Sequence, residues 1–457
     1  MKFPVAEHKA DAPPTTNRKI FRAAVVVGTF TVVAKVGATA RELAVARWFG
    51  RGDALDAFLI AFLVPAFLVN VVAGSFTAAL IPTFIQVRET EGREAAQRLF
   101  SSVTALSLGF LLGVSILLGL TAPYYLRLLG SGFGPAKLAL TRDLTYLLLP
   151  MVVLGGLEGI LVAILNAEER FALPAVLPVI SPLMAVLSLF AAGKSLGIFA
   201  LALGTVLGQA IETVVLLWAL KRRGVRFAPR WIGMGPNMRQ VALQYAAMVA
   251  GAFLMGGTSL VDQSMAAMLD PGSVAALNYA NKLVSAISGT ATLALSTAAL
   301  PYFSRMVAIE DWDGCRHTLK SYSRLTALAT VPITLGLVLY SRPLVRVLFQ
   351  RGAFTSADTS VVSSTQAMYS IQIPFYVLGI LLSRVVASLK RTDLLMYGAG
   401  INLTLDIILN LVLMKFMGVA GIALSTSLFY AGSFLYLGFW VVRLTGQKGS
   451  LAKTAVT

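Results

Sequence analysis

Charged side chains inside apolar segments are the residues of this sequence that could do chemistry. Lys35, Arg41 and Glu42 lie within the first apolar segment, and Lys282 lies within a later one. A charge inside a lipid-spanning helix costs at least a few kcal/mol, so it normally faces a water-filled cavity or a partner. Because Lys is a compact point charge and Arg can bind two oxygens at once, the natural ligand of such a set is a phosphate or pyrophosphate. The alternative is that these side chains reach the membrane interface or form a buried ion pair.

A pair of carboxylates opens the second apolar segment. Asp53 and Asp56 are three residues apart, which puts both on one face of a helix. Asp53 follows Gly52 and precedes an apolar run, as a residue that caps a helix start does. Asp56 lies further inside, and we expect it in the cavity, where it would gate or orient the ligand.

The second half of the chain holds a candidate cation site. Its members are two carboxylates, an amide and a hydroxyl in three apolar segments: Asp262, Asn402, Asp406 and Thr426. Asn402 and Asp406 are four residues apart and share one helical face. These hard oxygen ligands suit Na⁺ better than a soft metal, and Na⁺ would serve as a coupling ion. The alternative is polar contact between helices, with the aspartates protonated and hydrogen-bonded.

The composition indicates which elements must position these residues. Hydrophobic residues make up 57% of the 457 residues and charged residues 13%, and apolar runs of spanning length recur throughout. The sequence therefore predicts an all-α polytopic membrane protein with about 12 transmembrane helices. The predicted spans cover residues 20–46, 54–82, 99–122, 143–166, 173–193, 197–220, 239–269, 274–303, 322–341, 361–389, 394–416 and 419–442.

The same inspection excludes several classes of function. The net charge of +17 resides mostly in loops between spans, as the positive-inside rule expects, so it does not indicate nucleic-acid binding. Cys315 is the one cysteine, which rules out an intrachain disulfide, and both histidines lie outside the spans, which rules out a His-based intramembrane metal site. No Gly-rich phosphate loop, zinc-ligand spacing or nucleophile elbow occurs, so we do not expect an enzyme.

The basic residues also predict the orientation. With the N-terminus inside, the inner segments hold about 24 Lys and Arg residues and the outer segments about ten. Both termini and the loop 221–239 are therefore predicted to be cytoplasmic. Arg342, Arg346 and Arg351, on one outer loop, oppose this bias.

The chain repeats itself at an offset of about 220 residues. FTAALIPTFIQVRETEGREAAQRLF at 76–100 resembles LSTAALPYFSRMVAIEDWDGCRHTL at 295–319, and LRLLGSGF at 126–133 resembles VRVLFQRGAF at 345–354. Two six-helix lobes in the same orientation imply a pseudo-twofold axis along the membrane normal, with the ligand site between the lobes. The predicted parts are a disordered cytoplasmic tail over 1–19, an N-lobe over 20–220, a basic linker over 221–238, a C-lobe over 239–445 and a cytoplasmic tail over 446–457.

Several motifs make this sequence resemble the MurJ/MviN family of lipid II flippases, in the MOP exporter superfamily. They are AKVGATARELAVARWFG with DAFLIAFLVP, FTAALIP, GSVAALNYANKL and LVRVLFQRGAFTSADT, and the likeness covers about residues 20–440. The family's functional positions correspond, in order, to the basic residue of the first span, the Arg-Asp pair, the DAF aspartate and the basic residue of the YADR-like motif: Lys35, Arg41 with Glu42, Asp56 and Lys282.

The sequence departs from the family pattern at a few places. The Arg-Arg that follows the second-span proline in the family is Val69 and Asn70 here, so Asn70 is the substrate-binding candidate at that position. The acid of the YADR-like motif is Asn281, and the acid of the AEGAF-like motif is missing at 73–75. Many members have two further C-terminal spans that help form a groove for the lipid tail. Some relatives carry a sodium site among the corresponding helices, with an Asn-x-x-x-Asp spacing similar to that of Asn402 and Asp406.

The residues and the resemblance together predict a monomeric flippase of the bacterial cytoplasmic (inner) membrane. It would move a polyprenyl-pyrophosphate-linked saccharide, lipid II or a related lipid-linked glycan, by alternating access, without making or breaking a bond. Three alternatives stay open: a MATE-like cation-coupled exporter of small molecules, an integral-membrane glycan-processing enzyme, and a scaffold that transports nothing. No nucleic-acid partner is expected.

Overall fold

Helices make up all the regular structure in the computed structural model, which describes residues 16–233 and 235–454. The first group of helices is α1 (Thr16–Phe49), α2 (Asp53–Thr90), α3 (Arg93–Leu129), α4 (Pro135–Leu148), α5 (Pro150–Ala167), α6 (Ala172–Val176), the 3₁₀-helix η1 (Leu177–Val179), α7 (Ile180–Leu196) and α8 (Ile198–Lys221). The second group is α9 (Pro236–Ala266), α10 (Ser273–Ala308), α11 (Trp312–Leu339), α12 (Ser341–Phe349), α13 (Ser356–Ser370), α14 (Gln372–Ser388), α15 (Thr392–Met417) and α16 (Val419–Thr454).

Each of the predicted spans falls on one helix or on consecutive helices of this series. Within the described residues, nine segments are long and apolar enough to cross a membrane, and they include the pairs α4–α5 and α13–α14, each joined as one span. Pro150 begins α5 directly after Leu149, because a proline in mid-span has no N–H to continue the helix. The short helix α12 is charged and amphipathic, and it lies between the span of α11 and the span of α13–α14.

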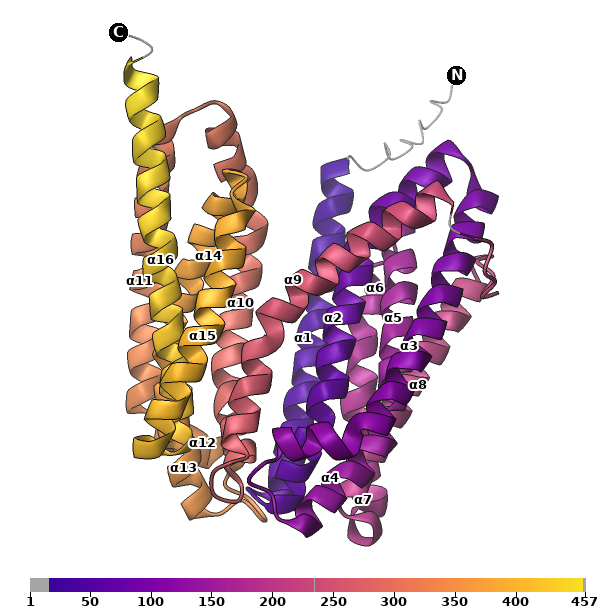
Figure 1. Ribbon diagram of the computed structural model, residues 1–457, viewed down its shortest axis with the longest axis vertical. Coiled ribbons are helices and arrows are strands. Elements are labelled where there is room, and N and C mark those ends of the chain that lie inside the picture. The colour runs from indigo at the N-terminus through magenta and orange to yellow at the C-terminus, as the bar shows by residue number, and fades with distance from the viewer. Residues whose placement is uncertain (1–15, 234, 455–457) are drawn as a thin grey trace, which may run out of the picture.

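The helices form two bundles arranged as a V (Figure 1). One bundle, the N-lobe, contains α1 to α8, and the other, the C-lobe, contains α10 to α16. The bundles converge at one end, here called the closed end, and diverge at the other, here called the terminal end, where α1 begins and α16 ends. The clusters of buried apolar side chains follow the same division.

Three clusters of buried apolar side chains hold the bundles together. One cluster crosses between the lobes at the closed end and includes Val45 and Phe58 of the N-lobe with Tyr279 and Phe354 of the C-lobe. The other two clusters lie within single lobes towards the terminal end, one around α2, α3, α5 and α8 and the other around α10, α14 and α16. The lobes therefore share one core at the closed end and keep separate cores at the terminal end.

Helix α9 belongs to both lobes. The predicted boundary at 239 places α9 in the C-lobe, but Met238 and Val241 join the N-lobe cluster, and Tyr245 stacks on Phe76 of α2 with ring centroids 4.3 Å apart. The last turn of α9, at Ala266, joins the shared cluster of the closed end. In Figure 1, α9 runs obliquely from the closed end across to the upper part of the N-lobe. Helix α9 thus packs on the N-lobe along its first part and joins the shared core at its last turn.

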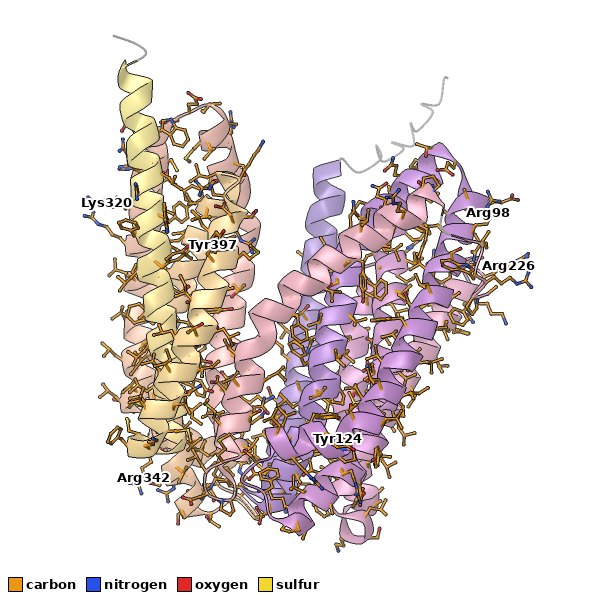
Figure 2. All side chains as sticks on the ribbon, viewed as in Figure 1. Arg98, Tyr124, Arg226, Lys320, Arg342 and Tyr397 are labelled. Carbon is orange, nitrogen blue, oxygen red and sulfur yellow. The ribbon has the colours of Figure 1, made fainter. Side chains whose placement is uncertain are left out.

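The predicted orientation makes the terminal end cytoplasmic. Figure 2 places the labelled Arg98, Arg226 and Lys320 at this end and Arg342 at the closed end. Replacing exposed Arg230 with Cys, in a Cys315→Ala background, should give a protein that a membrane-impermeant thiol reagent does not label in intact cells. A cysteine at exposed Ala136, next to the closed end, should label strongly. Labelling at position 230 and protection at position 136 would invert the predicted topology.

Candidate functional site

Asp56 of α2 caps a helix of the opposite lobe. Its Oδ2 accepts a hydrogen bond from the N–H of Gly272 at 2.7 Å, and its Oδ1 accepts one from the N–H of Ala275 at 2.8 Å. Both N–H groups belong to the start of α10, where first-turn donors have no partner in their own helix and an anion is favoured. Lys137 of α4 donates to Oδ2 at 2.9 Å, and Asp56 is 1% exposed. The structure therefore places Asp56 in a contact between lobes instead of on an open cavity wall.

Further contacts between the lobes surround Asp56. Arg51 forms an ion pair with Asp358 of α13 at 3.2 Å, and the hydroxyl of Tyr279 in α10 donates to the carbonyl of Gly50 at 3.2 Å. We call the set formed by Asp56, Lys137, Arg51, Asp358 and Tyr279 the closed-end latch. Most of its contacts join the N-lobe to the C-lobe, so the lobes cannot separate at this end without breaking them.

Two glycines allow the lobes to approach this closely. Gly50 has φ +53° and Gly272 has φ +83°, a conformation that favours glycine. A Cβ on Gly50 would overlap the carbonyl of Ala353, and one on Gly272 would overlap the carbonyl of Arg51. Side chains at these two positions would push the lobes apart.

An ion triad lies next to the latch, on the side of the terminal end. Glu42 of α1 accepts from Arg41 at 3.0 Å and from Lys282 of α10 at 3.1 Å, both on Oε1. The carboxylate of Glu42 is buried, whereas the side chain of Lys282 is 40% exposed. Arg41 Nε is buried without a hydrogen-bond partner. The structure thus brings Arg41, Glu42 and Lys282 together across the interface as an ion triad in which one donor, Arg41 Nε, is unsatisfied.

Lys35 lies about two turns further from the latch along α1. Its ammonium faces Gly289 of α10, because a Cβ on Gly289 would be 3.8 Å from Lys35 Nζ. Gly289 lies about two turns beyond Lys282, so the cations of both helices follow the same line along the interface. Lys35 is exposed, and so is Asn70 of α2, whose amide donates to the carbonyl of Ala66 in its own helix at 2.9 Å. The Asn70 amide is therefore hydrogen-bonded within α2 and not to a cation of the described residues.

The candidate cation site assembles from three helices of the second half. Asp262 of α9 accepts from Asn410 of α15 at 2.7 Å and from Thr426 of α16 at 3.2 Å. Asp406 is fully buried and accepts from Asn410 at 3.4 Å. The structure therefore unites Asp262, Asp406 and Thr426 and adds Asn410, which the sequence analysis had missed.

Asn402 is not part of this group. Its amide donates to Ser433 of α16 at 3.1 Å, one turn away from Asp406 in the other direction from Asn410. Asn402 and Asn410 are both four residues from Asp406, so helical spacing fits either. Which of the two asparagines joins the group depends on the position of Asp262, which is set by the packing of α9 against α15.

The oxygens of this group fit a monovalent cation. Asp406 Oδ2 and Asn410 Oδ1 are buried and lack a hydrogen-bond partner. The carboxyls of Asp262 and Asp406 interact with each other, and two adjacent buried carboxylates repel unless a proton or a cation lies between them. Carboxylate, amide and hydroxyl oxygens are hard ligands of the kind that Na⁺ accepts.

A polar cavity of about 270 Å³ connects the cation site to the interface between the lobes. Asp262 and Thr426 line its inner part, and Asn281, Ser285 and Gly289 of α10 line another part. Because Gly289 also faces Lys35, the cavity ends beside the line of cations. Asp262 and Thr426 are therefore the members of the cation site that an ion in this cavity would meet first.

Comparison of the chain with known proteins identifies its family. The model of the family "Lipid II flippase MurJ" matches residues 45–456. The chain belongs to the MurJ family. Members of this family are transporters rather than enzymes, so the expectation of a non-enzyme is confirmed and the alternative of a glycan-processing enzyme is set aside.

Curated MurJ relatives cover most of the chain. A probable lipid II flippase MurJ of Synechocystis sp. is 28% identical over 427 residues, which are 90% of this chain and 79% of the relative. A probable lipid II flippase MurJ of Thermotoga maritima is 27% identical over 417 residues, 90% of this chain and 83% of that protein. The predicted resemblance is therefore confirmed over nearly the whole chain.

Solved structures confirm the fold. A lipid II flippase MurJ in an inward closed conformation superposes with a TM-score of 0.80 at 24% identity, covering 91% of this chain and 87% of that one. An inward-facing MATE-family multidrug transporter of the MOP superfamily superposes with a TM-score of 0.74 at 11% identity, covering 93% and 99%. The prediction of an all-α polytopic membrane fold of the MOP type is confirmed, and the MurJ-family chain is a multi-pass membrane protein.

Proposed function

We propose that this MurJ-family protein moves a polyprenyl-pyrophosphate-linked saccharide, lipid II or a related lipid-linked glycan, across the bacterial cytoplasmic membrane by alternating access. The observation that carries the proposal is the line of cations at the interface. Lys35 and Arg41 come from the N-lobe and Lys282 from the C-lobe, next to the point where the shared core ends. A pyrophosphate bound there would contact both lobes at once, as a ligand that drives their relative motion must.

Glu42 supplies the counter-charge that a substrate would displace. Its single carboxylate binds both Arg41 and Lys282. A pyrophosphate offers more oxygens and more charge than one carboxylate, so it competes for both cations. Binding would free Glu42 from Lys282 and remove one of the ties between the lobes beside the latch.

Outward release requires the closed-end latch to open. Given the predicted topology, the latch lies at the outer surface and the divergent terminal end faces the cytoplasm. The lobes would rock about their interface until the Asp56, Arg51 and Tyr279 contacts break and the terminal end closes. Asp56 would thus act on the gate, and a direct contact with the substrate is not required for its role.

The function is tested by transport in proteoliposomes. A labelled polyprenyl-pyrophosphate saccharide is supplied on one face, and a membrane-impermeant enzyme that cleaves the saccharide reports its arrival on the other. Movement of lipid II, or of another glycan on the same carrier, supports the proposal. Export of a cationic drug without movement of any lipid-linked glycan would favour the MATE-like alternative.

We also propose Na⁺ as the coupling ion, held by Asp262, Asp406, Asn410 and Thr426. The purified protein should then melt at a higher temperature in sodium salts than in choline salts, because a ligand that binds only the folded state stabilises it. Asp406→Ala and Asn410→Ala should lose this difference. Asn402→Ala is the matched control, one turn away, and should keep it. Equal melting of the unmodified protein in both salts would leave protons or the membrane potential as the driving force.

A further inference from the structure

Two glutamates lie inside the N-lobe, far along their helices from either end. Glu158 lies near the middle of α5, and Glu212 lies in the second half of α8. Glu212 is 4% exposed and Glu158 is partly buried, and their carboxyls are near enough to interact. At this depth of an apolar bundle, two like charges without a cation would be costly.

Two donors reach these carboxyls. The N–H of Ser181 donates to Glu212 Oε1 at 2.7 Å, and this N–H is available because Ser181 lies in the first turn of α7. The amide of Gln209, one turn before Glu212, donates to Glu158. Gly155 makes room for that amide, since a Cβ at position 155 would be 2.6 Å from Gln209 Nε2.

One acceptor at the centre of this group lacks a donor. Gln209 is 6% exposed, and its Oε1 is buried with no hydrogen-bond partner. The nearby hydroxyls of Thr205 and Thr213 do not serve it, because they donate to the carbonyls of Leu201 and Gln209 in their own helix. Two carboxyls and one amide oxygen therefore face two donors.

No Lys or Arg of the described residues interacts with these carboxyls. Helix α4 also packs on α5 and α8, but its Lys137 is paired with Asp53 and Asp56. Helix α2 presents Val69 and Ala73 to the glycines of α5, and α3 presents Leu111. Helix α7 presents the backbone of Ser181. The electrostatic partners of Glu158 and Glu212 are each other, Gln209 and Ser181, and no Lys or Arg is among them.

We propose that Glu158, Gln209 and Glu212 form a proton-binding site in the N-lobe, in which one of the two carboxyls carries a proton at neutral pH. The proton removes the repulsion between the carboxylates and converts an acceptor into the missing donor. One proton meets both needs, whereas a metal ion would require further oxygen ligands. The site is separate from the cation site of the other half of the chain and does not depend on the proposed substrate.

Infrared spectroscopy of the purified full-length protein tests this site. The C=O stretch of a protonated carboxyl is distinct from the bands of a carboxylate. In an Asp262→Asn, Asp406→Asn background, which removes the carboxyls of the other lobe, we expect this band at neutral pH and its loss as the pH is raised. Adding Glu158→Gln and Glu212→Gln together should remove the band at every pH. Adding Glu94→Gln, an exposed glutamate at the start of α3, should leave it unchanged.

Three results would overturn the proposal. One is the absence of the band at neutral pH in the Asp262→Asn, Asp406→Asn protein, which needs no change to the N-lobe. Another is a band that survives the loss of both glutamates. The third is a band that responds to sodium concentration instead of pH, which would assign the site to a metal cation.

Discussion

Replacing both Lys35 and Lys282 with Gln is expected to abolish the ability of this protein to support growth of cells that lack their own flippase. Each lysine would make a charge-assisted contact with the pyrophosphate, and losing one such contact costs about 1.5–3 kcal/mol, roughly ten- to a hundredfold in affinity. The loss of both should weaken binding by about a hundredfold or more. Protein levels in the membrane, followed by immunoblotting, should stay unchanged.

A matched lysine separates this effect from a general loss of charge. Lys415, in the last turn of α15, is exposed. Lys415→Gln should support growth as the unmodified protein does. Each of the single variants Lys35→Gln and Lys282→Gln should show a partial or complete defect. Full activity of the double variant would show that the cations of the interface do not bind the substrate.

Replacing Asp56 with Asn should release the closed-end latch. The substitution removes the charge that binds the start of α10 and leaves Lys137, largely buried, with only the exposed carboxylate of Asp53 as its partner. The two hydrogen bonds from α10 are the Asp56 contacts that cross between the lobes, and a hydrogen bond to a charged group contributes about 1.5–3 kcal/mol. The outward-open state should therefore become far more populated. A cysteine at Ser273, which is buried beside Gly272 in the latch, should then react with an impermeant reagent from outside.

Asp53 provides the control for this experiment, because it binds the same lysine. Its carboxylate accepts from Lys137 at 2.6 Å but is 61% exposed, and exposed pairs contribute about 0–1 kcal/mol. Asp53→Asn should leave the cysteine at position 273 protected and transport nearly normal. Equal protection of that cysteine in Asp56→Asn and in the unmodified protein would mean that the Asp56 contact does not hold the lobes closed.

Substrate binding and the closed-end latch would act on the same motion of the lobes. Substrate would loosen the tie between Glu42 and Lys282, and the latch would set how much binding energy is needed before the lobes separate. A latch that is too weak would let the closed end open without substrate. Transport coupled to an ion requires that this leak be small, which gives a reason for the many contacts at the closed end.

The sequence alone determined the class of protein and most of the charged residues at the interface. Apolar runs of spanning length can form only helices in a membrane, because every backbone N–H and C=O must be satisfied within the segment. A charge in such a run is rare and costly, which made Lys35, Arg41 and Lys282 visible without any knowledge of their surroundings. The same rule would have revealed Glu158 and Glu212, which lie within the predicted spans 143–166 and 197–220.

The tertiary structure alone decided which residues meet. Asp56 and its partners Gly272 and Ala275 are separated by 216 and 219 residues, and the partners are backbone N–H groups, which every residue type offers. Helical spacing could not choose between Asn402 and Asn410, because both lie one turn from Asp406. Only the packing of α9 against α15 places Asp262 beside Asn410 and completes the group. Periodicity fixes the face of a helix on which a side chain lies, but the partner across that face is chosen by the packing of distant segments.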